Sequence, residues 1–346
     1  LGRRDFPTIG KTGLPFSKHW KTYLNRGDFD TPSAAPGFFF QRHAGAACYN
    51  AGPMQNDMPQ TAPGQEWRLR LFGRSLAGQL KLRAIAGLLG GSMEGRRGLD
   101  IGGHGGVFGH HLRRLGGEWR SLELDEGSAA ASSVVLGECG RVGADGKLPF
   151  ADASFDVVVA IDVLERVVDE TAFIAECHRV LKPKGWLVFT VPLIKPWGWL
   201  PPLRRVLGLT DERYGRLRPG YTESRLFELL KDGFDVQDAR TFSRFFVELV
   251  DTLGRFVLRR VNRDRAASDF AGMLSDEQDF RKIEKAFRVY SFLYPVFWLA
   301  AQLDGLLFFT RGYYLAARGK RRQWIPRRTP VLADGRSIAE AALGGK

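Results

Sequence analysis

Cysteine is scarce in this sequence, and its placement excludes two classes of protein. The 346 residues contain three cysteines, Cys48, Cys139 and Cys177. They have neither the close spacing of a zinc site nor the even count of a disulfide framework. We therefore expect reduced structural thiols, a cytoplasmic location and no bound metal.

Acidic residues are also few relative to basic ones. The chain has 51 Lys and Arg against 38 Asp and Glu, which gives a formal net charge of +13. A surface of this sign favours a negatively charged partner, such as anionic lipid headgroups, nucleic acid or an acidic substrate. The basic residues are concentrated in residues 311–328, which include no acid.

A long uninterrupted apolar segment is missing as well. Residues 289–309 are mostly apolar and aromatic, but Pro295, Gln302, Asp304 and Gly305 interrupt them, so we do not expect a bilayer crossing. Tyr and Trp favour the boundary between water and lipid, and a basic segment follows at once. Two interpretations stay open. The segment is either a helix that lies in a membrane surface or covers an apolar acceptor pocket, or a core helix of a second domain.

Glycine, by contrast, is concentrated at one place where a ligand is expected. Residues 99–106 read Leu-Asp-Ile-Gly-Gly-His-Gly-Gly and precede a helix-forming segment. This order is typical of a strand, a tight turn and a helix start, where glycines let the backbone approach a ligand. Phe108 stands at the third glycine position of a dinucleotide fingerprint, and no Gly-Lys-Ser/Thr follows, so both phosphate-binding patterns are excluded. The remaining pattern of Asp100, Gly102 and Gly106 suits a ligand with an ammonium and a ribose but no phosphate.

Further segments follow in the order of a known family. They are Ser121–Asp125, Ala144–Phe150, Ser154–Val159, Asp162–Glu165 and Arg179–Gly185. With residues 99–106, they resemble the class I S-adenosylmethionine-dependent methyltransferases of the bacterial small-molecule and lipid type, similar to the type 11 methyltransferases. The resemblance covers residues 66–243 and a last strand near 312–318. His104 and Arg166 depart from the family, which usually has Gly and often has His at these positions.

The resemblance implies S-adenosyl-L-methionine as the cofactor and the glycine turn as part of its site. Asp100 is expected to orient the methionine ammonium of the cofactor. The backbone of Gly102, Gly103, His104 and Gly106 is expected to line the cofactor. Because His tolerates positive φ better than most residues, His104 is compatible with such a turn.

The same resemblance implies ligands for the rest of the cofactor. Glu123 and Asp125 alternate along one strand, and one of them is expected to accept hydrogen bonds from both ribose hydroxyls, with Glu123 ahead. Asp145 is expected to accept a hydrogen bond from the adenine amino group, with Gly146 beside the ring. A plain turn role for Asp145 is the alternative.

Catalytic residues are harder to name, because methyl transfer gains most of its acceleration from positioning. Asp162 follows the fourth strand, where family members line the transfer site. His104 is a candidate general base because of its closeness to the cofactor. Tyr221 belongs to the loop of residues 213–222, at the ligand-binding edge of the sheet. Its arginines and tyrosines suit an anionic or sugar-bearing acceptor, and a solvated loop with a helix cap at Thr222 is the alternative.

The alternation of segments predicts an α/β fold. We expect a Rossmann-like, doubly wound, seven-stranded and mostly parallel sheet with an antiparallel last strand and an accessory helical insertion. Strands are expected near residues 98–102, 119–124, 140–144, 155–161, 185–191 and 234–242. Helices are expected at residues 66–89, 107–115, 171–181, 222–230 and 245–261.

The domain organisation follows from these elements. We expect a mobile extension at residues 1–62, a methyltransferase core at 63–243, a helical insertion at 244–311 that faces a membrane or the acceptor, a last core strand at 312–320 and a basic tail at 321–346.

The sequence therefore predicts an S-adenosylmethionine-dependent methyltransferase that acts on a small-molecule or lipid acceptor, glycolipid-like ones included. We expect it in the cytoplasm, at the inner face of a membrane reached through residues 289–328. An RNA methyltransferase is one alternative, but aromatic residues are not interleaved with Arg, so nucleic acid is not the expected partner. A catalytically inactive, membrane-associated binding or scaffold protein on the same fold is the other, favoured by His104.

Overall fold

The computed structural model describes most of the chain between residues 66 and 324. The described residues are 66–103, 105–143, 145–195, 198–211, 215–261, 277–307 and 309–324. The predicted extension, most of the predicted tail and His104 therefore lie outside the described residues.

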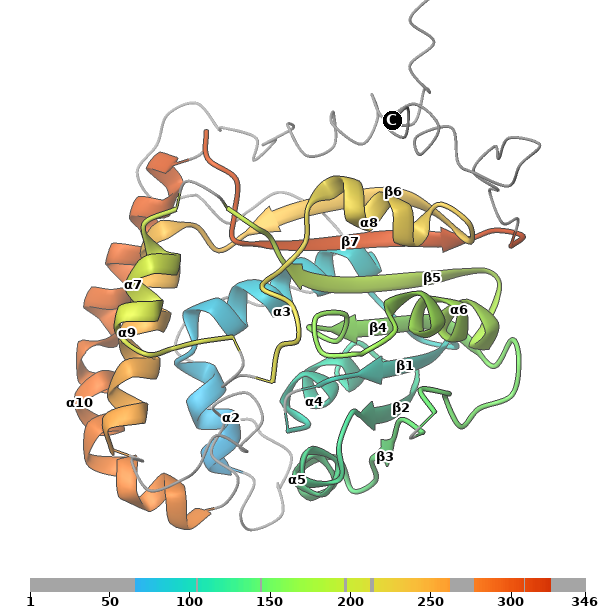
Figure 1. Ribbon diagram of the computed structural model, residues 1–346. Helices are drawn as coiled ribbons and strands as arrows, with labels where there is room; N and C mark the ends of the chain where they lie inside the picture. Colours follow the sequence, from blue (N-terminus) through green and yellow to red (C-terminus); the bar gives the residue numbers. More distant parts are fainter. Residues whose placement is uncertain are drawn as a thin grey trace, which may run out of the picture.

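Seven strands form one mixed sheet in the order β3-β2-β1-β4-β5-β7-β6. Their bounds are β1 (Arg97–Ile101), β2 (Glu118–Glu123), β3 (Gly140–Arg141), β4 (Phe155–Ile161), β5 (Leu181–Pro192), β6 (Phe234–Phe242) and β7 (Tyr314–Arg321). The first five pair in parallel, whereas β7 lies antiparallel between β5 and β6 (Figure 1). The predicted fold class, including its antiparallel last strand, is confirmed.

Helices cover both faces of this sheet. Their bounds are α2 (Glu66–Gly73), α3 (Leu76–Leu89), α4 (Val107–Arg113), α5 (Glu126–Leu136), α6 (Glu170–Val180), α7 (Leu200–Val206), α8 (Glu223–Leu230), α9 (Phe245–Val261), α10 (Glu277–Gln302) and the short 3₁₀ helix η3 (Leu303–Leu307). Apolar residues of α3, α4 and α7 share one core, and those of α6 and α8 share the other. A doubly wound sheet with two cores results.

Strand β4 shows why its sequence is almost continuously apolar. Val158 and Ala160 belong to the core beneath α6 and α8, whereas Val157, Val159 and Ile161 belong to the core beneath α3 and α4. A strand that is covered on both faces cannot alternate polar with apolar residues.

The strand order reverses between β1 and β4, which places the end of β1 beside the end of β4. Asp100 pairs with Val159, and Ile101 pairs with Ala160. In open α/β sheets, ligands bind outside the carboxyl ends of the strands at such a reversal. Residues 102–106 and 162–166 follow these two ends and therefore border the expected crevice.

In the sequence, the helical insertion comes between β6 and β7. In space, it lies on the side of the molecule toward which the parallel strands point (Figure 1). Its end is fixed to its start, because the Asp304 carboxylate in η3 accepts hydrogen bonds from the backbone N–H groups of Arg244 at 3.0 Å and Phe246 at 2.7 Å. No helix in the described part of the chain is long and apolar enough to cross a membrane.

Several elements differ from prediction. Strand β5 begins at residue 181 and not at 185, and α10 spans residues 277–302 where the apolar segment spans 289–309. The helix expected at residues 66–89 is divided, because Ser75 interrupts it and caps α3 by accepting a hydrogen bond from the Gly78 N–H at 3.1 Å. The predicted strand at 140–144 is only two residues long. Helix α7 was not predicted, although Pro in its first turn is a common helix start.

Candidate functional site

The glycine turn after β1 requires glycine for two physical reasons at Gly102. Its φ is +77°, and an added Cβ would lie 2.6 Å from the Val163 side chain and 2.7 Å from the Ile161 carbonyl oxygen. Any other residue would be strained by both the backbone conformation and the contact. At Gly103, an added Cβ would lie 3.2 Å from an oxygen of Asp100 and 3.9 Å from an oxygen of Glu123. The turn therefore passes directly beside both acids.

Gly106 serves packing in addition to turning the chain. It has φ +81° and precedes α4, and its added Cβ would lie 2.9 Å from the carbonyl oxygen of Ser132 in α5. Its lack of a side chain thus lets α4 begin close to α5. A contact of its backbone with the cofactor stays a prediction.

Asp100 is buried at the end of β1, with 1% of its surface exposed. Its carboxylate accepts a hydrogen bond from the Ser121 hydroxyl at 2.7 Å, and the Arg113 guanidinium lies 3.6 Å away. Burial raises the pKa of Asp100 to about 6, although Arg113 and Ser121 both lower it. The negative charge of Asp100 is therefore only partly compensated.

Glu123 is buried at the end of the neighbouring strand β2. One oxygen accepts a hydrogen bond from the Ser132 hydroxyl at 2.7 Å. Burial raises the pKa of Glu123 to about 8, and the nearby charge of Asp100 adds to the effect. We call Asp100, Gly102, Gly103 and Glu123 the cofactor half of the site. Its two acids accept hydrogen bonds from serine hydroxyls and place negative charge beside the glycine turn.

The other predicted cofactor residues lie at the same edge of the sheet. Asp125 caps α5 by accepting a hydrogen bond from the Ser128 N–H at 2.9 Å, while its second oxygen is buried without a hydrogen-bond partner among the described residues. Asp145 is exposed, and its carboxylate accepts from the Lys147 N–H at 3.1 Å, which lowers its pKa. Gly146 follows with φ +78°. Asp145 and Gly146 thus form a turn, and adenine binding by them stays a prediction.

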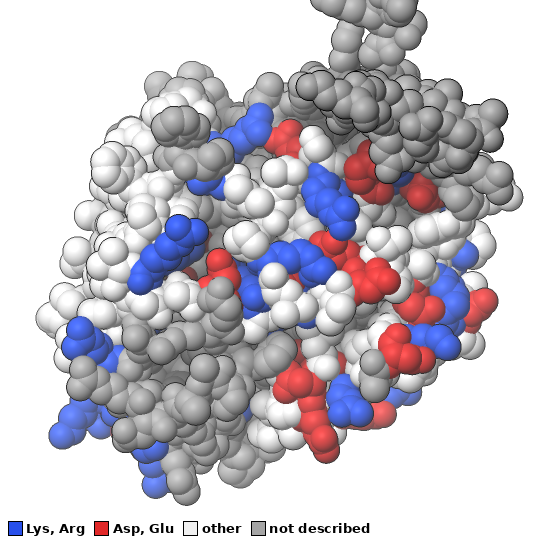
Figure 2. Space-filling model, viewed as in Figure 1, with Lys and Arg blue, Asp and Glu red and all other residues white. Residues whose placement is uncertain are grey.

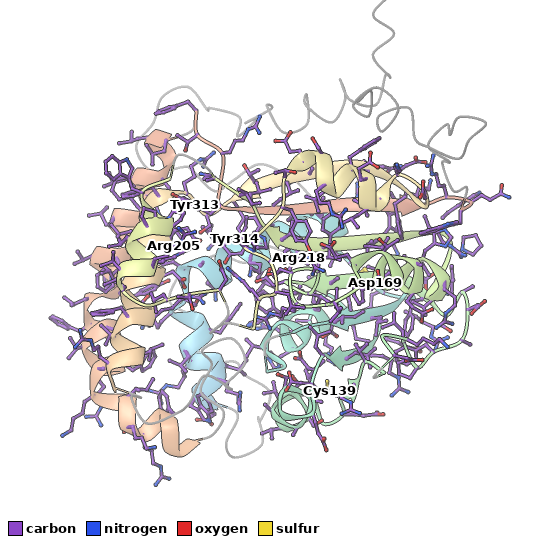
Figure 3. The ribbon with its side chains drawn as sticks, viewed as in Figure 1. Cys139, Asp169, Arg205, Arg218, Tyr313 and Tyr314 are labelled. Atoms are coloured by element: carbon purple, nitrogen blue, oxygen red, sulfur yellow. The ribbon has the colours of Figure 1, made fainter. Side chains whose placement is uncertain are left out.

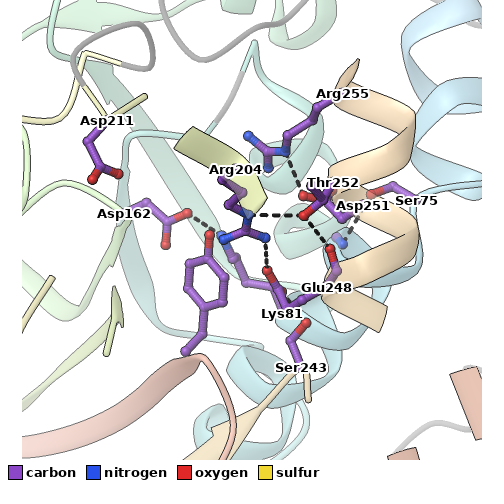
Figure 4. Close-up of polar contacts among 12 residues, drawn as sticks. Ser75, Lys81, Asp162, Arg204, Asp211, Ser243, Glu248, Asp251, Thr252 and Arg255 are labelled. Carbon is purple, nitrogen blue, oxygen red and sulfur yellow. Dashed lines mark hydrogen bonds and ion pairs between the residues drawn. The ribbon is translucent and has the colours of Figure 1, made fainter. Parts of the chain in front are cut away.

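Asp162 closes β4 in a left-handed conformation with φ +52°. The Thr190 hydroxyl donates a hydrogen bond to one carboxylate oxygen at 2.7 Å, and Lys81 forms a buried ion pair with the other (Figure 4). Lys81 comes from α3, so this helix brings a cation to Asp162. No local pattern in the sequence indicates this pair, because its members are 81 residues apart.

A second buried ion pair ties α7 to the insertion. Arg204 donates to the Glu248 carboxylate at 2.6 Å and to the Thr252 hydroxyl at 2.9 Å, and Ser243 also hydrogen-bonds Glu248 (Figure 4). Arg204 therefore fixes α7 against α9.

A third acid, Glu165, is fully buried beside the site. Arg216 lies close to it, with 3.7 Å between Nε and a carboxylate oxygen, and neither oxygen has a hydrogen-bond partner among the described residues. Burial and the charge of Asp162 raise the pKa of Glu165 to about 7. Arg216 donates to the Tyr314 hydroxyl at 2.9 Å. We call Lys81, Asp162, Glu165, Arg216 and Tyr314 the acceptor half of the site.

Arg166 lies between the two halves. Burial lowers its pKa, and Glu165, Asp162 and Glu123 are among the acids that act in the opposite direction. The sequence shows this position as a departure from the family, where His is common. The structure places a guanidinium there instead, close to acids of both halves.

The arginines of the loop before α8 make hydrogen bonds and ion pairs with other residues of the protein. Arg218 donates to the carbonyl oxygens of Val167 and Val168 at 2.6 Å, and it also pairs with Glu170 at 3.4 Å (Figure 3). Arg216 and Arg218 are thus engaged within the protein. They are neither part of a solvated loop nor available as predicted for an anionic acceptor. The predicted cap at Thr222 is confirmed by its hydrogen bond from the Arg225 N–H at 3.3 Å.

The remaining predicted catalytic residues are less informative. Tyr221 is 2% exposed and belongs to the core with α6 and α8, where burial and Glu170 raise its pKa above the usual range. A catalytic role for Tyr221 stays a prediction, and His104 lies outside the described residues. Among the described residues, no cluster of His, Cys, Asp or Glu could hold a metal ion.

Comparisons with known proteins agree with this geometry. Residues 99–189 match the family model described as a methyltransferase domain. The ubiquinone biosynthesis O-methyltransferase of Paracidovorax citrulli is 30% identical over 118 residues, which cover 32% of this chain and 49% of that protein. The protein of the same name from Parvibaculum lavamentivorans is 35% identical over 106 residues, which cover 29% and 41%. The chain thus spans about half the length of these relatives or less.

The chain also has a limited similarity to solved structures. One is a SAM-dependent methyltransferase of Thermotoga maritima, 16% identical, with a TM-score of 0.44 and coverage of 74% of this chain and 95% of that one.

Residues 99–189 therefore match a methyltransferase domain, as the motifs predict. The cofactor of the predicted class is S-adenosylmethionine, and the cofactor half fits it. The buried acids and the oxygen of Asp125 that has no hydrogen-bond partner among the described residues provide negative charge and hydrogen-bond acceptors beside the turn.

Proposed function

We propose that this protein transfers a methyl group from S-adenosylmethionine to a small-molecule or lipid acceptor at the inner face of a membrane. The observation that carries the proposal is the pair of buried acids at the ends of β1 and β2, directly beside the glycine turn. S-adenosylmethionine supplies a methyl group on a positively charged sulfur, so in-line displacement needs positioning more than covalent help.

In this proposal each acid holds a different part of the cofactor. Asp100 attracts the ammonium, and Glu123 accepts hydrogen bonds from the ribose hydroxyls, while Asp125, Asp145 and Gly146 border the nucleoside. Charge-assisted hydrogen bonds to a carboxylate are strong when both partners leave water. Binding a cation also stabilises the ionised form of acids whose pKa burial has raised.

The acceptor half supports an acceptor without strong negative charge. Its buried acids, Asp162 and Glu165, face Lys81 and Arg216, so these cations are already engaged. The relatives are named for O-methylation in ubiquinone biosynthesis. We therefore propose a phenolic hydroxyl on a ring with an apolar substituent as the acceptor group.

Calorimetry with S-adenosylmethionine tests the cofactor site. The wild type should bind, and Asp100→Asn should bind about 30-fold more weakly because a neutral amide cannot attract the ammonium. Glu138→Gln is the matched control, because Glu138 is an exposed acid that pairs with Arg120 in β2. Absent binding, or equal loss in the control, would contradict the proposed site.

Release of S-adenosylhomocysteine tests the reaction. Purified protein is incubated with S-adenosylmethionine and, in parallel, with a phenol that has an isoprenoid tail, the same phenol without the tail, or total RNA. We expect release with the tailed phenol above the other two. Release with RNA alone would favour an RNA methyltransferase, and cofactor binding without any release would favour an inactive binding protein.

A further inference from the structure

Helix α10 leaves a row of large apolar side chains exposed. Val289, Phe292, Val296 and Leu299 of α10 and Leu303 at the start of η3 are exposed by 60%, 83%, 62%, 64% and 41%. They recur every three or four residues, so they share one side of the helix. The opposite side is buried: Phe280, Ile283 and Phe287 pack with Trp67 of α2. The exposed row is therefore not needed to hold α10 on the protein.

The row is extended by the neighbouring helix and by the segment after α10. Leu253 and Val257 of α9 are exposed by 47% and 46%, and Leu306 and Phe309 by 68% and 73%. Helices α9 and α10 contact each other along their lengths and lie side by side at one margin of the molecule (Figure 1). A soluble monomer rarely exposes a contiguous apolar surface of this extent without using it.

The beginning of the same side of α10 is cationic. Arg281, Lys282 and Lys285 are exposed and precede Val289 at helical spacing. Figure 2 shows Lys and Arg side chains at the lower left, over the start of α10, and mostly uncharged surface above them. Apolar residues preceded by lysines are typical of helices that lie in the surface of an anionic membrane.

Charge also decides between a membrane and a second copy of the chain. The chain has a net charge of +13, so pairing two copies through this surface would bring like charges together. Anionic lipid headgroups are attracted to the same cations. The apolar row spans about 20 Å along the helix axis, which suits a helix that lies flat.

We infer that the outer side of α10 docks on an anionic lipid bilayer. Lys282 and Lys285 contact headgroup phosphates, and Phe292, Val296 and Leu299 enter the boundary between headgroups and acyl chains. The inference deepens the proposed function, because the parallel strands point toward this side of the molecule (Figure 1). An acceptor with an apolar tail could then reach the crevice from the same bilayer.

Vesicle flotation tests the inference with the whole protein. The wild type should float with vesicles of phosphatidylcholine and phosphatidylglycerol and bind at least tenfold more weakly to pure phosphatidylcholine. The triple variant Phe292→Asp, Val296→Asp, Leu299→Asp should lose binding at least tenfold to both. Val134→Asp is the control, because Val134 is a half-exposed apolar residue on α5, away from the docking side.

A charge variant tests the contribution of the lysines separately from that of the apolar row. Lys282→Glu with Lys285→Glu should weaken binding to anionic vesicles about tenfold and reduce its dependence on salt. Calorimetry with S-adenosylmethionine should be unchanged in every variant, which shows that the fold and the cofactor site are intact. If the wild type does not bind S-adenosylmethionine, the proposed function is overturned. Vesicle binding is then still a separate result.

Two outcomes would overturn the docking inference. One is that the wild type does not float with anionic vesicles, or that the apolar triple variant floats as well as the wild type. The other is a stable dimer in light scattering that the triple substitution converts to a monomer, because a second copy would then cover this surface.

Discussion

The two halves of the site hold their buried acids in different ways. In the cofactor half, Asp100 and Glu123 accept hydrogen bonds from serine hydroxyls, and burial still raises the pKa of each. In the acceptor half, Asp162 is paired with Lys81, a cation of the protein itself. Arg113 also lies near Asp100, so the contrast is clearest between Glu123, which accepts from a serine hydroxyl, and Asp162, which Lys81 neutralises. The charge of a ligand is therefore expected to matter mainly in the cofactor half.

The largest effect is expected when the acceptor half loses its own cation. Lys81→Met leaves Asp162 buried without this partner, so the free energy of unfolding should fall by about 3 kcal/mol. Urea denaturation measures the change. Arg120→Met, which breaks an exposed pair with Glu138, should have little effect. Equal stability of the two variants would contradict a buried, stabilising pair.

The glycine turn gives the next largest effect. Gly102→Ala should lower the free energy of unfolding by about 2 kcal/mol, because it combines positive φ with contacts to Val163 and Ile161. Gly137→Ala is the matched control: Gly137 has φ +81° but nothing within 4 Å of an added Cβ. Thermal unfolding of both variants isolates the contribution of the close approach. If the two variants lose the same stability, the turn is not tightly packed.

The cofactor half should respond to pH, since an ionised carboxylate accepts hydrogen bonds from ribose hydroxyls more strongly than a protonated one. With the pKa of Glu123 raised to about 8, its ionised form dominates above pH 8 and is lost as the pH falls through that value. Affinity for S-adenosylmethionine should therefore be about tenfold weaker at pH 7 than at pH 9. Calorimetry across this range measures it. Glu123→Gln should bind weakly with no such dependence, and an unchanged slope in this variant would assign the titration elsewhere.

The smallest effect is expected from removing a single hydroxyl, that of Ser132. Ser132→Ala removes the donor that lowers the pKa of Glu123, so the pH profile of binding should move upward and affinity at pH 7.5 should fall about threefold. Ser133→Ala, on the same helix, removes only a hydroxyl that donates to the Ala129 carbonyl at 2.9 Å. A shift of equal size in both variants would show that helix α5, and not the hydroxyl, is responsible.

Much of the fold follows from local patterns in the sequence. The bounds of β4, β6 and α9 agree with prediction, because each has a periodic or continuous apolar pattern with a clear end. The division of the first helix at Ser75 was missed, since a capping serine inside a periodic segment is a weak signal. Strand β3 was predicted too long, because a two-residue edge strand leaves little pattern.

The site was predictable where motifs are contiguous and not where distant segments meet. Asp100, Gly102, Gly103 and Glu123 come together as expected from the ends of adjacent strands. Lys81 was not predicted as a site residue, because nothing local shows that it reaches Asp162. Glu165 was not predicted as a site residue, because its burial beside Arg216 depends on a loop some fifty residues further along the chain.

The position of β7 has a consequence for synthesis of the chain. This strand, among the final described residues, lies between β5 and β6, which were made earlier. On the ribosome, β5 and β6 therefore expose unpaired backbone groups toward each other until residues 314–321 have emerged. The nascent chain cannot complete its sheet during most of translation, and a truncation before residue 314 would leave it permanently open.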